Sequence, residues 1–387
     1  MPHLRKRHLL EEVQKQAKYW PVIAVLGLRQ SGKSTLLRGV VNEDRQITLD
    51  DVDALEDVHL SSKNFLAKLG TPVVIDQVQK APALFDAIKL RVDLQRRPGQ
   101  YYLTGSSQFS AQIGIRESLT GRIGIHYLYP FTLAETFGKP LDEARIQAWH
   151  KVKVRFSVEE AVKRLSLGGL PVPLFARDPE IRRRYFENWI ETAVIRDAAR
   201  TYGKGYDPDV SWSILRQMGQ TLREGELPTL NHFRQSSRKL RRYLDALENI
   251  FLLRKIPCHE LGVGKEVWMI TDGGLARQVM GSDLGEGSTL SLARIFLLNE
   301  LLSNSESAGN RIRPVYYKTA RGGPVDLVWN DSILKVSIFP KSQTAYDQRP
   351  LQAALKKLRL KKSFLVTLRD EVVFDGGAGM VPLTYWS

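Results

Sequence analysis

The segment from Val22 to Leu37 reads VIAVLGLRQSGKSTLL, and it decides the fold of the first part of the chain. It opens with a run of β-branched and apolar residues, which is typical of a buried strand. The next eight residues, Gly27 to Ser34, follow the pattern G-x-x-x-x-G-K-S, and helix-forming residues come after them. A strand, a glycine-rich turn and a helix in this order predict a loop that binds the phosphates of a nucleoside triphosphate.

The residue types in this loop suit that task. Glycines let consecutive backbone N–H groups point inward at an anion, and the following helix adds its positive end. Lys33 is expected to reach the β- and γ-phosphates, and Ser34 to give its hydroxyl to Mg²⁺. We therefore predict ATP and Mg²⁺ as ligands, and the nucleotide-binding residues Gly27, Arg29, Gln30, Ser31, Gly32, Lys33, Ser34 and Thr35.

A second apolar strand ends in an acidic residue. Residues Pro72 to Lys80 read PVVIDQVQK, and Asp76 is expected to help hold the Mg²⁺. Gln77 follows, at a position where many ATPases of this type carry a glutamate that polarises the attacking water. An amide can orient water but cannot take its proton. Losing a general base costs roughly 10²–10⁴ in rate, so we predict tight ATP binding and slow turnover.

The length and composition limit the number of domains, the disulfides and metal sites, and the cellular location of the protein. With 387 residues the chain is long enough for two or three domains. The single cysteine, Cys258, excludes an intramolecular disulfide framework and suits a reducing cytoplasm, and the seven histidines have no zinc-site spacing. The charged N-terminus has no secretory h-region, and no apolar run approaches the roughly 20 residues of a membrane span. We expect a cytoplasmic protein with no membrane partner.

The charge points to a polyanion. The formal net charge is +15, from 57 Lys and Arg residues against 42 Asp and Glu residues. Such an excess favours nucleic acid as a partner, and DNA is the expectation here. A basic protein without such a partner is the alternative.

Several segments resemble the bacterial and archaeal P-loop ATPases of the AAA+ class that carry a DUF4143-type C-terminal region. They are ITLDD from Ile47, VVIDQVQKAPALFDAIKLRVD from Val73, YYLTGSS from Tyr101, SLTGRIGIHYLYPFTLAE from Ser118 and GGLP from Gly168, with the basic segment up to Arg196-Asp197. That family usually has Asp-Glu-Val-Gln where this chain has Asp76-Gln77-Val78-Gln79. Either the natural chain departs from the pattern, or the glutamine was introduced to trap the ATP-bound state, which we favour.

The predicted fold class is α/β, with an ATPase core over residues 1–135. A helix is expected from Leu4 to Trp20, and helical patterns separate the first four strands. Such alternation predicts a parallel sheet covered on both faces, with the ligand at the carboxyl ends of its strands. The predicted strands are Val22–Leu26, Gln46–Leu49, Val73–Asp76, Tyr101–Thr104 and Ile123–Tyr127.

Two further catalytic candidates follow from the resemblance. Ser106 is chosen over Thr104 as the residue that senses the γ-phosphate, with a plain turn as the competing interpretation. Arg122 would reach the nucleotide of a neighbouring subunit, with Arg116 as the alternate candidate and a surface salt bridge as the competing interpretation. An arginine that acts in trans requires a homo-oligomer, and a hexameric ring is expected.

Residues 136–205 are interpreted as a helical lid and connector, and residues 206–285 as a winged-helix-like module. Leu240, Tyr243, Leu244, Leu247 and Phe251 form an apolar stripe at helical spacing. Ser236 and Ser237 are candidate caps, a short helix is expected from Leu230 to Gln235, and strand-like FLLRKI and EVWMIT follow. Such a helix often lies in a DNA groove, so Arg238, Lys239, Arg241 and Arg242 are the DNA-binding candidates; packing between subunits is the alternative.

Residues 286–387 resemble a nuclease fold of the PD-(D/E)xK type that has lost its active site. Asp326 stands at the first metal-ligand position, but Lys335-Val336-Ser337 replaces Glu-x-Lys, and Arg294 lies where a further carboxylate is expected. We therefore expect no DNA cleavage from this part. Its basic stretch LKKLRLKK, from Leu355, could contact a backbone or form a solvated helix face.

These features predict an ATP-binding AAA+-like ATPase that acts as a ring on DNA, by remodelling or translocation. The alternative is a nucleotide-gated scaffold or regulator of a protein partner, with little hydrolysis.

Overall fold

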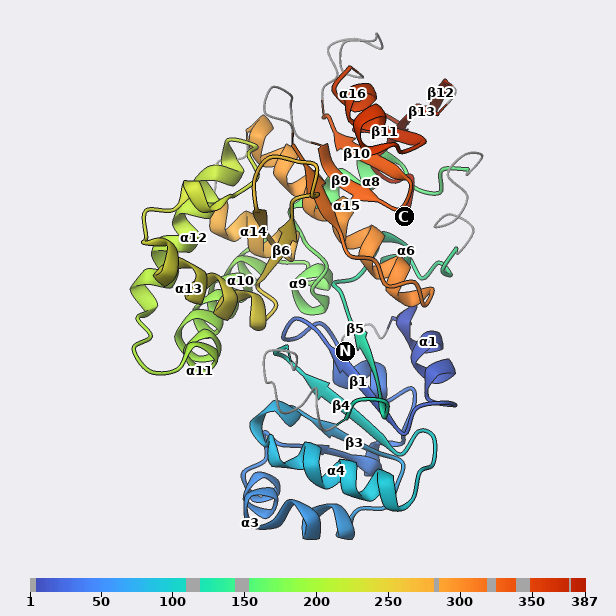
Figure 1. The fold of residues 1–387 in the computed structure, drawn as a ribbon, viewed down its shortest axis with the longest axis vertical. Helices are drawn as coiled ribbons and strands as arrows, with labels where there is room; N and C mark the ends of the chain where they lie inside the picture. Colours follow the sequence, from blue (N-terminus) through green and yellow to red (C-terminus); the bar gives the residue numbers. More distant parts are fainter. Residues whose placement is uncertain are drawn as a thin grey trace.

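The structure is a computed structural model that describes residues 5–108, 119–142, 153–281, 285–318, 325–338, 349–375 and 377–387. Figure 1 shows a five-stranded sheet with its helices at the bottom, a group of helices at the left, and a six-stranded sheet at the top right. We call these the ATPase part, the helical part and the C-terminal part. Among the described residues, no helix combines the length and apolar character that a membrane span requires.

The ATPase part contains a parallel sheet with strand order β2-β3-β4-β1-β5. All five predicted strands are confirmed to within one residue. Its elements are α1 (Leu9–Gln16), β1 (Val22–Leu26), α2 (Lys33–Leu37), a 3₁₀ turn (Glu43–Arg45), β2 (Gln46–Thr48), α3 (Val52–Lys68), β3 (Val73–Asp76), a 3₁₀ turn (Val78–Lys80), α4 (Ala83–Leu94), β4 (Tyr101–Gly105) and β5 (Ile123–Tyr127).

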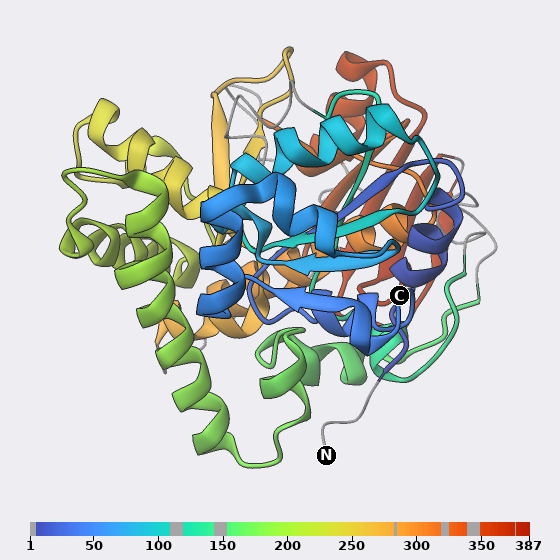
Figure 2. The same cartoon turned by 90° about the horizontal axis from the view of Figure 1, so that it is seen from below.

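Helices cover both faces of this sheet, as predicted. Side chains alternate between the faces along a strand, so Ile23 and Val25 pack with α1 and α2, whereas Val22 and Ala24 pack with α3 and α4. Figure 2, seen from below, shows α3 and α4 in front of the strands. Because all of β1 is buried, its apolar run has no polar side.

The first helix is shorter than the prediction of Leu4 to Trp20, because α1 begins at Leu9 and ends at Gln16. Contacts with a distant residue set its start. Arg7 Nε lies 3.1 Å from Glu135 Oε1, and the His8 N–H donates to the same oxygen at 2.8 Å. Arg7 and His8 therefore contact Glu135 and do not join the helix. Helix propensity, which depends on neighbouring residues, could not predict this.

The segment between residues 131 and 205 is mainly helical, as predicted, but it divides between two parts of the molecule. The short helices α6 (Leu133–Thr136) and α8 (Val158–Leu165) associate with the C-terminal part, since α8 packs on α15 and the Leu133 N–H donates to Glu300 Oε1 at 2.7 Å. The remaining helices join the helical part. Its elements are α9 (Pro171–Phe175), α10 (Pro179–Thr192), a π-helical turn (Ala193–Ala198), α11 (Ala199–Tyr202), α12 (Pro208–Arg223), a 3₁₀ turn (Leu230–His232), α13 (Ser237–Asn249), β6 (Leu253–Pro257), β7 (Glu266–Ile270) and α14 (Gly273–Met280).

The predicted apolar stripe of α13 is buried, and β6 pairs antiparallel with β7. Two local predictions were wrong. The helix expected from Leu230 to Gln235 is a single 3₁₀ turn, which the Thr229 N–H closes by donating to His232 Nδ1 at 3.0 Å. Ser236 occupies the N-cap position of α13, but its side chain makes no capping hydrogen bond.

The C-terminal part consists of a long helix and a mixed sheet with strand order β12-β13-β11-β10-β9-β8. Strands β8, β9 and β10 are antiparallel neighbours, and β10 runs parallel to β11 after the crossover helix α16. The elements are α15 (Glu286–Ser307), β8 (Val315–Tyr317), β9 (Val325–Trp329), β10 (Ser332–Val336), α16 (Arg349–Leu358), β11 (Lys362–Thr367), β12 (Val373–Asp375) and β13 (Ala378–Pro382).

Glu300, on α15, lies inside the contact between the C-terminal part and α6, and burial raises its pKa to about 7. Between pH 4.5 and 7 the folded chain holds this proton and the unfolded chain does not, so the free energy of unfolding falls as pH rises through this window. Glu300→Gln keeps an acceptor for the Leu133 N–H and removes the titration. We expect the variant to be more stable than the parent at pH 8, by about 1–3 kcal/mol, and similar to it at pH 4.5.

Thermal melting of both proteins at the two pH values measures this difference. The matched control is Glu224→Gln, at an exposed carboxylate. Equal pH dependence in the parent and Glu300→Gln would contradict the assignment.

Candidate nucleotide-binding site

The loop between β1 and α2 adopts a conformation that most side chains disfavour. Gly27, Gln30 and Gly32 have φ values of 152°, 61° and 98°. A Cβ at Gly27 would collide with the carbonyl oxygen of Leu128, because the chain after β5 lies directly against the loop. The glycine is therefore required by both conformation and space. The loop leads directly into α2, which begins at Lys33. The first N–H groups of that helix therefore face the loop.

Lys33 is buried within the loop. Its Nζ donates to the carbonyl oxygens of Gly27 at 3.0 Å and Leu28 at 2.9 Å. Burial lowers the pKa of Lys33 to about 8, while the charge of Asp76 acts in the opposite direction. The fully buried hydroxyl of Ser31 has no hydrogen-bond partner in the part of the chain that the structure describes. An ammonium group and an unpaired hydroxyl beside the first N–H groups of α2 match the oxygens of a triphosphate.

Asp76 ends β3 beside the loop, where hydroxyl groups from two directions hold its carboxylate. Ser34 Oγ donates to Oδ2 at 2.9 Å, and Thr104 Oγ1 donates to Oδ1. Burial raises the pKa of Asp76, and the hydrogen bond from Ser34 lowers it. Thr104 therefore has a role that sequence reasoning missed, which is to orient the carboxylate.

Oxygen donors of this kind fit Mg²⁺. No group of three or more His, Cys, Asp or Glu side chains in the described residues could hold a metal ion. A magnesium ion at Ser34 and Asp76 would therefore need phosphate oxygens and water as its further ligands, as is usual for this ion.

Gln77 lies next to Asp76 in a left-handed conformation, with φ 60° and ψ 40°. Its Oε1 accepts from Gln79 Nε2 at 2.6 Å and from Ser106 Oγ at 3.1 Å. The structure thus brings together Gln77 and Ser106, the predicted water-positioning and sensor residues, and adds Gln79, which the sequence reasoning missed. Both hydrogen bonds reach the oxygen of Gln77, so a glutamate at this position could accept them equally well.

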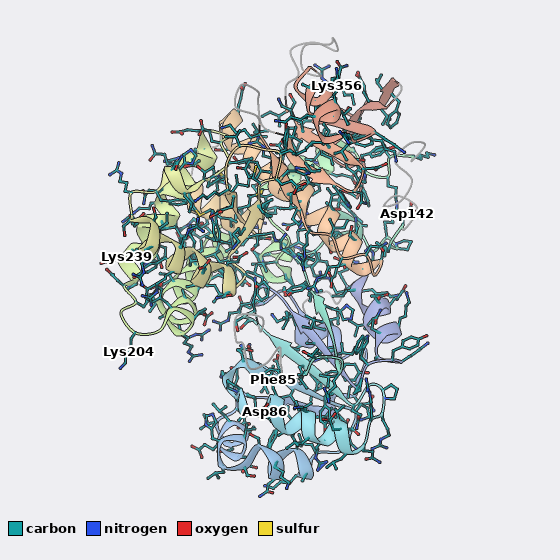
Figure 3. All side chains as sticks on the ribbon, viewed as in Figure 1. Phe85, Asp86, Asp142, Lys204, Lys239 and Lys356 are labelled. Atoms are coloured by element: carbon teal, nitrogen blue, oxygen red, sulfur yellow. The ribbon has the colours of Figure 1, made fainter. Side chains whose placement is uncertain are left out.

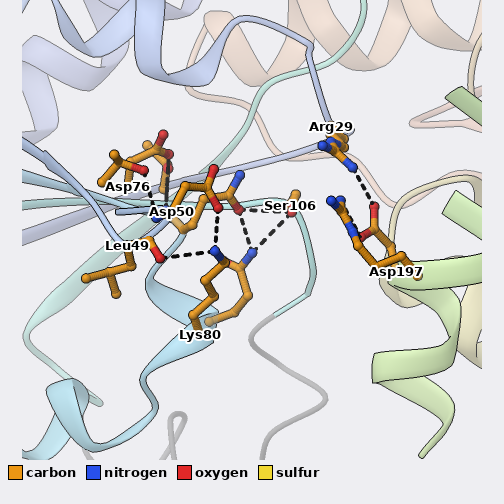
Figure 4. A network of polar contacts seen from close by, with 12 residues as sticks. Arg29, Leu49, Asp50, Asp76, Lys80, Ser106 and Asp197 are labelled. Carbon is orange, nitrogen blue, oxygen red and sulfur yellow. Dashed lines mark hydrogen bonds and ion pairs between the residues drawn. The ribbon is translucent and has the colours of Figure 1, made fainter. Parts of the chain in front are cut away.

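The helical part docks onto the outer side of the loop, as Figure 4 shows for Arg29 and Asp197. Arg29 NH1 lies 3.3 Å from Asp197 Oδ2, on the π-helical turn. The Trp189 indole N–H donates to the Arg29 carbonyl at 3.3 Å, and the Tyr185 hydroxyl donates to Gln30 Oε1 at 2.6 Å. A single continuous stretch of helix therefore contacts two residues of the phosphate loop.

Arg122 lies at the amino end of β5, at the opposite edge of the sheet from the loop. It forms a two-point ion pair with Asp93, with Nε–Oδ1 at 2.6 Å and NH2–Oδ2 at 3.0 Å. This is the salt bridge of the competing interpretation, and reaching another subunit would require Arg122 to leave it. A role in trans stays a prediction. Arg116, the alternate candidate, lies outside the described residues.

The structure also places the residues that were predicted to contact DNA. Three of the four basic residues of α13 have partners nearby: Arg241 pairs with Glu266 at 3.0 Å, Arg242 lies 4.2 Å from the Tyr202 ring centroid, and Lys239 lies 6.0 Å from that of Tyr243. Figure 3 labels Lys204 and Lys239 at the outer edge of the helical part, and Lys356 at the far end of the C-terminal part.

In the C-terminal part, Arg294 Nε lies 2.8 Å from Asp326 Oδ1, and both side chains are buried. The buried arginine therefore neutralises the Asp326 carboxylate. A nuclease-like fold that has lost its metal site stays a prediction.

Comparisons with known proteins agree with this geometry. Residues 19–137 match a family model described as an AAA domain, and they contain the loop, Asp76 and Ser106. This segment is a P-loop ATPase domain of the AAA class. Nucleotide hydrolysis is the general activity of that family. The match does not extend to the rest of the chain.

Curated relatives cover more of the chain. An uncharacterized protein of Mycobacterium tuberculosis, Rv2008c, and one of Mycobacterium bovis, Mb2031c, are each 26% identical to it over 272 residues. The match covers 68% of this chain and 57% of the length of each relative.

Two solved structures have a limited similarity to this chain. The Walker-type ATPase PABY2304 of Pyrococcus abyssi is 15% identical, with a TM-score of 0.45, over 72% of this chain and 99% of that one. A DNA replication initiation factor is 14% identical, with a TM-score of 0.25, over 62% of this chain and 90% of that one.

Proposed function

We propose that this chain is a cytoplasmic AAA-class ATPase that assembles as a ring on DNA and couples ATP hydrolysis to DNA remodelling or translocation. The observation that carries the proposal is the direct contact between the phosphate loop and the helical part, through Arg29 and Asp197. The same helix continues into α11, where Tyr202 packs against Tyr243 and Arg242 of α13. A change in loop conformation can therefore pass into the basic helices.

The site residues divide the chemistry between them. Lys33 and the N–H groups at the start of α2 bind and neutralise the phosphate oxygens, while Ser34 and Asp76 position the metal. ATP supplies the phosphoanhydride bond, and Mg²⁺ spreads the charge on its phosphates. Gln77, held by Gln79 and Ser106, orients the attacking water but cannot accept its proton. Turnover by this chain is therefore slow in the proposal.

The other parts serve as binding surfaces. We propose that α12, α13 and the β6–β7 pair form a winged-helix-like module, and that the C-terminal part is a nuclease-like scaffold with no cutting activity. The Arg294–Asp326 ion pair supports the loss of cleavage, because a positive charge at a metal position opposes Mg²⁺. The unpaired Cys258 suits the reducing cytoplasm.

Fluorescence anisotropy with a labelled duplex tests the DNA proposal, with ATP and Mg²⁺ present and salt varied from 50 to 200 mM. Phosphate contacts release counterions, so a site with six to ten contacts loses about 10³–10⁵ in affinity over that range. We expect a steep fall of this kind, together with ATP-dependent assembly in sedimentation. Binding that is insensitive to salt, or absent at low salt with ATP, would refute the proposal.

A second function has one observation in its favour. The neutral side chain of Gln77 is held in place by two donors and has no acid or base function. This favours a nucleotide-gated scaffold or regulator for a protein partner, in which ATP binding alone changes the state. ATPase activity that DNA stimulates would exclude it.

A further inference from the structure

A groove of about 510 Å³ follows the exposed side of α12. The polar side chains that line it are Ser213, Arg216, Gln217, Gln220, Arg223 and Arg234. Arg216 and Arg223 are two helical turns apart, which places both on one side of α12 with about 10 Å between their Cα atoms. Arg234 comes from the segment before α13. The groove therefore collects three arginines from two segments of the helical part.

Hydrogen bonds join the two segments that form the groove. The backbone N–H of Arg234 donates to Gln217 Oε1 at 2.8 Å, and Gln217 Nε2 donates to the Ser213 carbonyl at 2.9 Å. Gln235 Nε2 donates to Ser213 Oγ at 3.1 Å. These hydrogen bonds hold the segment that carries Arg234 against α12.

The three guanidinium groups are exposed, and in the described residues none has a carboxylate within ion-pair distance. This differs from α13, where Arg241 is paired with Glu266. Of the nearby carboxylates, Glu224 follows Arg223 in the chain and is exposed, and Glu226 is engaged with His232 at 3.0 Å. Glu187 and Glu191 line an adjoining pocket with Arg216, but neither forms an ion pair with it, and Glu187 is paired with Arg183. The groove thus presents uncompensated positive charge that the sequence patterns did not single out.

We propose that this groove binds the phosphate backbone of DNA, an inference that rests on the proposed function and names its contact surface. Arginine, glutamine and serine side chains are common donors to phosphate oxygens. An acidic protein surface is a weaker fit, because protein interfaces have an apolar core rich in aromatic residues. In the described part of this groove, Val279 and Met280 are the apolar lining residues, and no aromatic side chain lines it.

The groove is also connected to the ATP site. The Tyr206 hydroxyl donates to the Val194 carbonyl at 2.6 Å, and it lies 2.9 Å from Ser211 Oγ on α12. Val194 belongs to the π-helical turn that carries Asp197, the partner of Arg29 in the phosphate loop. DNA held in this groove would therefore lie on the helix that is tied to the nucleotide-contacting segment.

The test compares DNA affinity and its salt dependence in two triple variants of the full chain. One is Arg216→Ala, Arg223→Ala and Arg234→Ala. The charge-matched control is Lys63→Ala, Arg96→Ala and Arg97→Ala, which removes three exposed positive charges from the ATPase part. Each lost phosphate contact lowers the slope of log K against log salt by about 0.9. We expect the groove variant to lose about 10–100-fold in affinity at 0.1 M salt and to show a slope smaller by about 2–3.

The outcomes separate the two proposals. A parent that binds no DNA at low salt with ATP overturns the proposed function, and the groove assignment with it. A parent that binds DNA while the groove variant matches the control overturns the groove assignment alone. An affinity loss with an unchanged salt slope also overturns it, because phosphate contacts are then not what was removed. If polyglutamate of matched length displaces the duplex as well as unlabelled DNA does, the groove is a site for acidic protein.

Discussion

Replacing Gln77 by glutamate is expected to raise the ATP hydrolysis rate about 10²–10⁴-fold, the usual contribution of a general base. The structure leaves room for this change, since both hydrogen bonds to the Gln77 side chain reach its oxygen, which a carboxylate also provides. The new carboxylate would stand beside Asp76 at the carboxyl edge of the sheet and could take the proton of the attacking water. Phosphate release under saturating ATP and Mg²⁺, with and without duplex DNA, measures the change.

The matched control is Gln79→Glu. It adds the same charge two residues away, in the same hydrogen-bond network, and we expect no gain in rate from it. A Gln77→Glu protein that hydrolyses no ATP, either with or without DNA, would favour the scaffold function over the motor. DNA-stimulated activity would favour the motor.

Replacing Lys33 by alanine is expected to weaken ATP binding about 100-fold or more. Hydrogen bonds to charged groups contribute about 1.5–3 kcal/mol each, and the lysine can donate to two phosphates. Its ammonium group now lies against the carbonyls of Gly27 and Leu28, at the centre of the loop. Calorimetric titration with ATP, with Mg²⁺ present, gives the two affinities.

Because Lys33 also bonds the loop itself, the thermal melt of Lys33→Ala without nucleotide must be compared with that of the parent. Lys18→Ala removes an exposed lysine of the same part and serves as the control, with no expected loss of ATP affinity. Unchanged affinity in a folded Lys33→Ala protein would show that the loop is not the nucleotide site. The groove, the Gln77 network and the DNA proposal would then lose their common basis.

Much of the ATPase part could be predicted, because its signals are local. The strand β1, the loop and α2 follow one another within Val22 to Leu37, and each is specified by neighbouring residue types. The placement of Asp76 beside Ser34 follows from parallel strands whose carboxyl ends share one edge. The buried stripe of α13 was predictable for a similar reason, since its spacing matches the helical period.

The failures had both distant and local causes. The start of α1 depends on the distant Glu135, whereas a local hydrogen bond between Thr229 and His232 closes a single turn where a longer helix was expected. The role of Arg122 in trans was inferred from resemblance and stays a prediction, but its ion pair with Asp93 could not be foreseen, because Asp93 belongs to a helix that only the fold brings beside it. Periodicity reports that a face is apolar and says nothing about which element covers it.

The sequence by itself determined that this chain has a phosphate loop, a parallel sheet around it and a helical region after it. Each of these features follows from residues that lie close to one another in the sequence, within one helix or one pair of neighbouring elements. Only the tertiary structure decided which side chains complete the site and what the loop contacts. Gln79 and Ser106 meet at Gln77, and Arg29 meets Asp197, across 168 positions of the chain. Such contacts form because packing brings distant segments together, and no local pattern records them.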